Sequence, residues 1–395
     1  MKLRLNQLQK NLATFSFLLL FPGYFFYHYA IGRDYIPPVL GGYFGIVSVF
    51  LLVPLAMANL KLVIKNFDLP VLIFFAIMLL TLVVAVMQYV LGNPKFLTEE
   101  MLAWSISGFI FNLVCFFVAA RLSIKEVAKY GYWLIPLMAT IVLLNIGDRG
   151  FFYLKAEVGE FSSIVSGYQG FGRSIVTLLL LVCGFYYKRR YRLYPLIIIG
   201  IVGLFFNGAR TEFILFILVL VVVKLFYSIR SPRNFLSLFF LMGISVLFMV
   251  NFAELFIDSR ISGLLDLSSG TSASIRLIQI SYAIEQTFQN PVLGNYGSYV
   301  ELGGVGSYPH NLLSAWLNLG LVGLSLYVSL FIALWIIALK GFLDKNNDEY
   351  FNVFLFFLVF VSAALIVSKD HSYMLVGLLV GFYVQLSGKK KEILQ

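Results

Sequence analysis

The sequence predicts an all-α, polytopic integral membrane protein, because three of its properties agree. Hydrophobic residues make up 60% of the 395 residues and charged residues only 12%, too few to give a soluble domain its polar shell. Apolar runs of about 17–25 residues, the length that crosses a hydrocarbon core of about 30 Å, recur along the chain. Positive charges favour alternate connections between these runs. We expect one transmembrane domain, 1–395, of about twelve helices.

The expected spans follow one another with few interruptions. The first has basic residues before its apolar core, but no small-x-small cleavage site follows, so we expect a retained helix rather than a signal peptide. The spans lie near 12–31, 36–59, 69–92, 102–120, 130–147, 172–187, 193–208, 212–229, 235–256, 311–339, 351–368 and 373–387.

The net charge of +10 is explained by orientation rather than by a nucleic-acid partner. With the N-terminus in the cytoplasm, most of the 29 Lys and Arg residues fall on inside connections. The other nine fall outside: Arg33, Lys95, Arg149, Lys155, Arg173, Arg210, Arg260, Arg276 and Lys369. This bias predicts cytoplasmic termini at both ends, membrane lipids as partners of the apolar surface, and no nucleic acid.

Two connections on the outer side, 148–171 and 257–310, are long, and function is expected there. Within the second, "SIRLIQISYAIEQTFQNP" predicts a short amphipathic helix on the outer membrane surface. Thr271 or Ser272 is suited to cap this helix, and Asn290-Pro291 to end it.

Ionisable residues are almost absent from the middle of the spans, where a transporter normally needs them. A transporter, such as a flippase for lipid-linked oligosaccharide, is therefore a poor fit to this sequence. The unusual charges are Arg173, Arg210, Arg276 and His310, and all lie at outer ends of spans or in the outer loop.

Arg210 lies in the tight turn "FNGARTE" between two spans. One interpretation is structural: Arg210 pairs with Glu212 or Glu254, or anchors to a lipid phosphate. The other is an anion site. Thr211 would cap the span that follows, and Pro309 to Asn311 would open another, so that free N–H groups of two helix starts face the same layer.

The remaining polar residues at the outer ends have alternative interpretations. Arg173 in "GYQGFGRS" reaches the same anion site or anchors its helix. His28, among "YFFYHYA", fits an interfacial aromatic belt, and His371, in "SKDHSY", fits a solvated turn. Four outer tyrosines are candidates for stacking on sugar rings: Tyr168, Tyr296, Tyr299 and Tyr308.

Three motifs together resemble the O-antigen polymerase and O-antigen ligase superfamily. They are "GART" at 208–211, the pattern R-x11-F-x2-P-x2-G-x2-G from Arg276 to Gly297, and "PHNLLSAWLNLGLVG" ending at Gly323. The expected topology is similar as well, with a long outer loop just before the helix that opens with His-Asn. The motifs cover about 120 residues, and the architecture covers the whole chain.

The resemblance implies a membrane-embedded, GT-C-like glycosyltransferase in the bacterial inner membrane, with its active site on the periplasmic face. Such an enzyme moves a glycan from undecaprenyl pyrophosphate to a sugar hydroxyl and uses neither a metal nor a cofactor. Arg210 and Arg276 would hold the pyrophosphate, because guanidinium groups bind phosphate bidentately. His310 would accept the proton of the acceptor hydroxyl or orient it, while Asn311 fixes the loop.

Two points stay open within the superfamily. A polymerase uses the next lipid-linked repeat unit as acceptor and works with a chain-length regulator, whereas a ligase uses a lipid A core sugar; "GNYG" followed by "SYPHNLL" favours the polymerase.

Many relatives carry an acidic residue after His-Asn, where this chain has Ser314 and Ala315. A carboxylate base would then come from the outer loop, where the candidates are Asp258, Asp266, Glu285 and Glu301.

Overall fold

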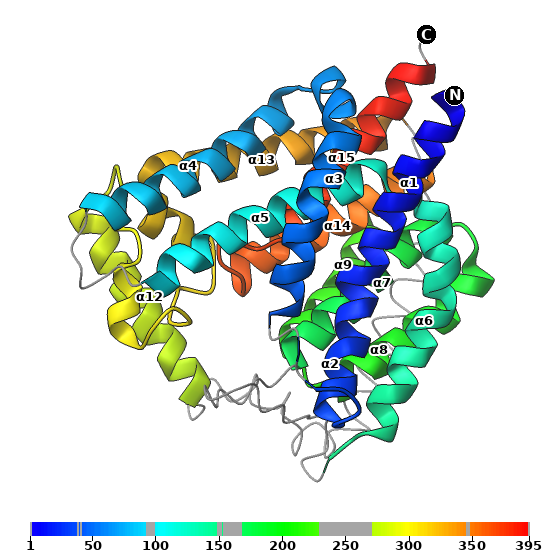
Figure 1. The fold of residues 1–395 in the computed structure, drawn as a ribbon, viewed down its shortest axis with the longest axis horizontal. Coiled ribbons are helices and arrows are strands. Elements are labelled where there is room, and N and C mark those ends of the chain that lie inside the picture. The colour runs from blue at the N-terminus through cyan, green and yellow to red at the C-terminus, as the bar shows by residue number, and fades with distance from the viewer. Residues whose placement is uncertain are drawn as a thin grey trace.

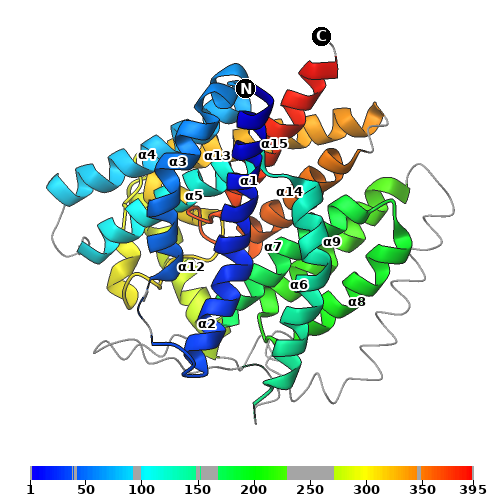
Figure 2. The ribbon, with the colours of Figure 1, turned by 45° about the vertical axis from the view of Figure 1, so that its right-hand side comes forward.

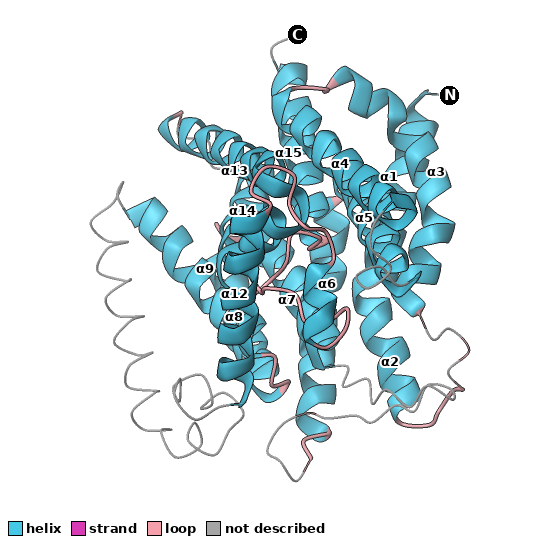
Figure 3. Ribbon diagram, turned by 90° about the vertical axis from the view of Figure 1, so that its left-hand side faces the viewer, coloured by secondary structure: helices cyan, strands magenta, loops and turns pink. Residues whose placement is uncertain are grey.

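The computed structural model describes residues 2–37, 39, 42–91, 99–147, 152, 168–228, 271–344 and 348–393. Within these ranges almost every residue is helical and no strand forms (Figure 3). The predicted all-α class is thereby confirmed. The expected span near 235–256, most of the outer loop 148–171 and residues 257–270 of the second loop lie outside the described residues.

Eight of the described helices are long and apolar enough to cross a membrane, so the chain is a multi-pass membrane protein. They are α3 (Tyr43–Lys65), α4 (Leu69–Leu91), α5 (Glu99–Arg121), α6 (Ile124–Leu144), α7 (Tyr168–Tyr186), α9 (Arg210–Ser228), α13 (Leu313–Leu343) and α14 (Glu349–Val367). Two further helices match expected spans, α8 (Arg190–Phe206) and α15 (Leu375–Ile393). The total of about twelve remains a prediction.

The N-terminal helical path runs from Lys2 to Gly32 in three parts: α1 (Lys2–Leu18), a π-turn η1 (Leu19–Gly23) and α2 (Tyr24–Gly32). Pro22 lies inside the π-turn, and the residues at both junctions keep helical dihedral angles. A proline has no N–H for the helical ladder, and a π-turn is one way in which a helix accommodates that loss.

The predicted span 36–59 is displaced in the structure. Its helix, α3, begins only at Tyr43 and continues to Lys65. The delay has a local cause, because Ile36 precedes two prolines and Gly41-Gly42 follows them, and both kinds of residue disfavour helix.

Glycines allow the closest helix contacts. A Cβ atom added to Gly377 on α15 would lie 2.0 Å from the backbone oxygen of Asn112, and one added to Gly381 would lie 2.4 Å from that of Phe116. The two glycines are four residues apart and so face α5 together, as small residues do in membrane helix pairs. These contacts fix α15 against α5 near the site described below.

The helices form two groups joined by the N-terminal path. In Figures 1 and 2, helices α6 to α9 lie together on one side, while α4, α5, α12 (Thr271–Gln289) and α13 lie on the other. Helix α14 packs on α7 and α9, and α15 on α5. The N- and C-terminal ends lie at the same end of the molecule (Figure 1).

Candidate functional site

The site is built around a break in α13. Gly320 has φ 66° and ψ −168°, so the helix is interrupted after its first two turns. The segment that follows α12 takes over the hydrogen bonds lost there: Leu321 N–H donates to the carbonyl of Pro291 at 2.9 Å, and Asn295 N–H donates to that of Leu317 at 2.6 Å. Broken helices of this kind are tolerated in membrane proteins where neighbouring protein satisfies the backbone.

The glycines of the loop motif explain why the two segments can touch. A Cβ on Gly320 would lie 1.9 Å from the carbonyl oxygen of Val292, and one on Gly294, where φ is 75°, would lie 2.6 Å from Gly320 N. Gly297 also has positive φ, and its N–H donates to the Asn318 side chain at 3.0 Å. We call this contact between 291–297 and 317–321 the clasp. It holds the first two turns of α13 in place.

The entry to α13 carries His310. The Asn311 side chain accepts the N–H of Leu313, the first residue of the helix, at 3.0 Å and so holds the loop against the helix start. His310 is half-buried, and its ring lies 4.6 Å from that of Tyr308. The helix starts at Leu313, two residues later than the expected opening at Pro309 to Asn311.

Charges from two other elements act on His310. Burial, reinforced by the positive charges of Arg276 on α12 and Lys369 on the turn between α14 and α15, lowers the pKa of His310 to about 4. The negative charge of Asp370 and the backbone of Ser368, which lies within hydrogen-bonding reach of the imidazole, act in the opposite direction. His310 is therefore neutral at pH 7 and able to accept a proton.

Arg173 acts electrostatically on Tyr308, the neighbour of His310. Burial and the charge of Asp370 raise the pKa of Tyr308, whereas Arg173 and Arg276 lower it. The Arg173 guanidinium also lies over the rings of Tyr24 and Phe44, 5.8 and 5.5 Å from their centroids. The charges of Arg173 at the start of α7 and Arg276 on α12 thus both act on Tyr308, whose ring contacts that of His310.

Arg210 begins α9, half-buried, two residues before the buried Glu212, and Gly208 in the same turn has φ 70°. The prediction that Thr211 caps this helix is wrong. Phe213 N–H donates to the carbonyl of Ala209, so the cap position falls on Ala209 and Thr211 lies inside the first turn. The N-terminal end of α9 nevertheless reaches the site through Glu212.

Glu212 forms a buried ion pair across the site. Its carboxylate lies 2.8 Å from the ammonium of Lys369, and the two side chains are 3% and 18% exposed. Of the partners expected for Arg210, Glu212 therefore binds Lys369, and Glu254 lies outside the described residues.

The turn 368–373 between α14 and α15, which we call the SKDHSY turn, is the part of the site that sequence reasoning missed. His371 was expected in a solvated turn and is instead 5% exposed. Its N–H donates to the Ser314 hydroxyl at 2.9 Å, and its carbonyl accepts from the Tyr327 hydroxyl. The signal in the sequence was three titratable residues in succession in a very short connection between two apolar spans.

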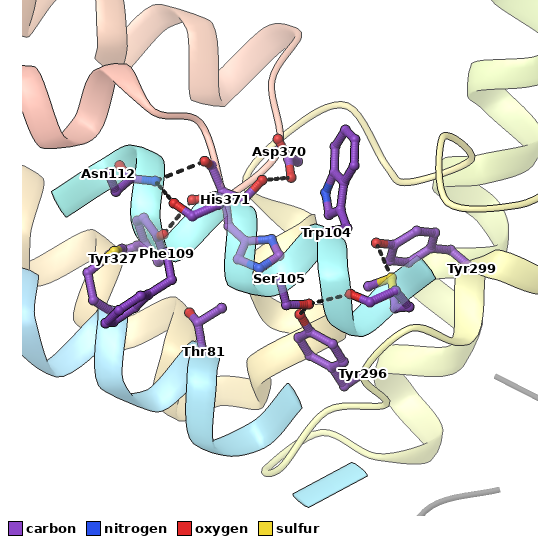
Figure 4. A pocket seen from close by; sticks show the side chains of 14 residues that line it. Thr81, Trp104, Ser105, Phe109, Asn112, Tyr296, Tyr299, Tyr327, Asp370 and His371 are labelled. Carbon is purple, nitrogen blue, oxygen red and sulfur yellow. Dashed lines mark hydrogen bonds between the residues drawn. The ribbon is translucent and has the colours of Figure 1, made fainter. Parts of the chain in front are cut away.

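A small cavity with a mixed polar and apolar lining lies beneath this turn (Figure 4). The imidazole of His371 points into it between α4 and α5, toward Thr81 and Ser105, and Ser105 is hydrogen-bonded to the Tyr296 hydroxyl. The space for the centre of a water molecule is about 10 Å³, which is room for one water. This space is too small for a sugar ring.

The other candidates take different places. His28 packs against the rings of Tyr24, Tyr27 and Tyr43 beside Arg173, and its place in an interfacial aromatic belt stays a prediction. Of the four candidates for sugar stacking, Tyr296 and Tyr299 are buried, Tyr308 is partly open, and the Tyr168 side chain lies outside the described part.

The carboxylates expected near His310 lie elsewhere. Glu285 and Glu301 are exposed, and Glu301 accepts from the Tyr282 hydroxyl at 3.3 Å. Asp258 and Asp266 are outside the described residues. Among the residues that are described, no group of three or more His, Cys, Asp or Glu side chains is arranged to hold a metal ion.

Comparison with known proteins adds no family assignment. No protein-family model matches the chain, and no curated protein matches its sequence.

Proposed function

We propose that this protein is a GT-C-like glycosyltransferase that polymerises lipid-linked polysaccharide repeat units. The observation that supports the proposal is the convergence of two arginines and one neutral histidine, Arg173, Arg276 and His310, on the start of a broken helix. Cations and a proton acceptor side by side are what the displacement of a pyrophosphate by a hydroxyl requires.

In the proposed reaction, the acceptor hydroxyl oxygen attacks the anomeric carbon of the donor glycan. The bond between that carbon and the pyrophosphate oxygen breaks, and its electron pair leaves with undecaprenyl pyrophosphate. His310 takes the hydroxyl proton as the new bond forms. Arg276 and Arg210, with Arg173 beside them, bind the departing pyrophosphate through paired N–H groups and balance its charge, which is the basis for proposing a reaction without a metal or other cofactor.

The proposal places the enzyme in the bacterial inner membrane with its site at the periplasmic face, where lipid-linked units are joined. Donor and acceptor are both undecaprenyl-pyrophosphate-linked, and a chain-length regulator is a proposed partner. The same geometry suits a ligase that transfers the finished glycan to a lipid A core sugar, because the two reactions differ only in the acceptor. A flippase is a poorer fit, since the charges described here gather at helix ends rather than along a path between the helices.

A strain that lacks the gene separates these functions. Its surface polysaccharide is resolved on a gel, and its undecaprenyl-linked glycan is extracted in parallel. Core capped with a single repeat unit and no ladder supports the polymerase. Uncapped core with long chains on the lipid carrier supports the ligase.

Complementation provides the controls. Wild-type protein should restore the ladder, whereas His310→Ala, present in the membrane at a matched level, should not. Single repeat units that accumulate on the cytoplasmic side of the membrane would instead indicate a flippase, and an unchanged polysaccharide in the deletion strain would contradict all three functions.

A further inference from the structure

The SKDHSY turn is attached to the start of α13 at two points. The backbone of Ser368 lies within hydrogen-bonding reach of His310, and the N–H of His371 donates to the hydroxyl of Ser314 at 2.9 Å. His310 and Ser314 are four residues apart, and Ser368 and His371 are three residues apart. Asp370 lies between the two attachments and is therefore held beside the entry of α13.

The Asp370 side chain is itself fixed. It is 9% exposed, and its Oδ2 accepts the Ser372 hydroxyl at 2.5 Å. The carbonyl of Ser372 in turn accepts from the Asn112 side chain on α5 at 3.0 Å. Figure 4 shows Asp370 and His371 leaving the turn in different directions, and both residues line the small cavity. The negative charge of Asp370 acts on both Tyr308 and His310.

We infer that Asp370 is a positioning residue for His310: its fixed negative charge stabilises the imidazolium that forms when His310 accepts the acceptor proton. This inference rests on the proposed function. Asp370 would also supply the carboxylate that this chain lacks shortly after His-Asn. Ser314, which stands there, accepts the N–H of His371 and so holds the turn.

The physical reason is the balance of charge around His310. The groups that act on it are Arg276 from α12, Lys369 and Asp370 from the SKDHSY turn, and the half-buried Tyr308 in its own loop. Arg276 and Lys369 are cations, so they disfavour the positive charge that His310 gains when it accepts a proton. In a partly buried site, a fixed carboxylate stabilises that imidazolium as the proton is transferred, the same role that aspartate has in a Ser-His-Asp triad.

The test uses purified protein in liposomes with a synthetic lipid-linked repeat unit, and it measures rates across pH. Asp370→Asn should lower kcat by about tenfold to a hundredfold, leave KM within about twofold, and move the acidic limb of the profile to lower pH because His310 becomes a weaker base. Glu301→Gln, which removes an exposed carboxylate from the same outer segment, is the matched control and should behave as wild type.

An opposite shift tests the electrostatic claim independently of folding. Glu212→Gln with Lys369→Met removes both members of an ion pair and one cation that acts on His310, so the acidic limb should move to higher pH. Adding Asp370→Asn to that double variant should move it back down. If Asp370→Asn is too unstable to purify, Asp370→Glu, which keeps the charge, should retain more activity than Ser372→Ala combined with Asp370→Glu.

The outcomes distinguish the two proposals. Wild-type protein without transferase activity in this assay would contradict the proposed function. Active wild-type protein whose kcat and acidic limb are both unchanged by Asp370→Asn would overturn the role of Asp370 and leave the proposed function intact.

Discussion

The ammonium of Lys369 lies 2.8 Å from the carboxylate of Glu212, and this pair joins the SKDHSY turn to the first turn of α9. Lys369 precedes Asp370, and Glu212 follows Arg210 by two residues. One buried contact therefore sets the spacing between the segment that carries Arg210 and the segment that faces His310.

Breaking this pair should destabilise the protein. Glu212→Gln leaves a mostly buried ammonium without its counter-charge, and removal of one partner of a buried ion pair costs about 3 kcal/mol. The unfolding midpoint of detergent-solubilised protein, followed by tryptophan fluorescence, should fall clearly. The double variant Glu212→Gln with Lys369→Met should recover part of the loss. A Glu212→Gln variant as stable as wild type would show that the ion pair does not stabilise the protein.

The clasp should depend on glycine at two positions. Gly320→Ala and Gly294→Ala place a Cβ where φ is positive and where backbone atoms lie within 2.6 Å, so we expect a loss of about 2 kcal/mol or more in the free energy of unfolding. Gly306→Ala lies in the same outer segment with open space around its Cβ and ordinary φ, and it should change little. Equal effects of all three substitutions would argue against the clasp.

The arginines should not be replaceable by lysine. Arg276→Lys and Arg210→Lys keep the charge but lose the planar fork that binds phosphate bidentately, so transfer activity should fall by about tenfold or more at a matched protein level. Arg33→Lys, an exposed arginine at the end of α2, is the control. Near-normal activity of the two lysine variants would contradict the bidentate contact.

His310 should link stability to pH. Its pKa is about 4 in the folded protein and about 6.5 in the unfolded chain, so between these values the unfolded chain binds more protons. The free energy of unfolding should therefore fall as pH drops from about 6.5 toward about 4 and be unaffected by His310 above that range. Unfolding midpoints at pH 7 and pH 5 should differ less in His310→Gln than in wild type. An equal difference in both would mean that His310 is not buried as described.

The fold class was predictable because the length of an apolar run is set by the thickness of the bilayer. The entry of α13 was predictable as well, since proline, histidine and asparagine before an apolar run have few purely structural explanations. The first residue of a helix was harder to predict from the sequence. At α9, the choice between Ala209 and Thr211 as the cap depends on one hydrogen bond.

The SKDHSY turn could not be predicted, because its burial depends on which helices surround it. Asp370 and His371 occupy a short connection that in most membrane proteins is solvated. Here the turn is buried and hydrogen-bonded to Ser314 and Tyr327 of α13 and to Asn112 of α5. The clasp was hidden for the same reason, since Gly294 and Gly320 meet only after the loop has folded back on a broken helix.

We expect His310 to take part in glycan transfer from a lipid pyrophosphate. Purified protein in liposomes, supplied with a synthetic undecaprenyl-pyrophosphate repeat unit, tests it directly through the glycan products and the released lipid pyrophosphate. Wild-type protein should give a ladder of longer glycans with one undecaprenyl pyrophosphate released per bond, and His310→Ala should give neither product. Glycan transfer that persists undiminished in the folded His310→Ala protein would contradict it.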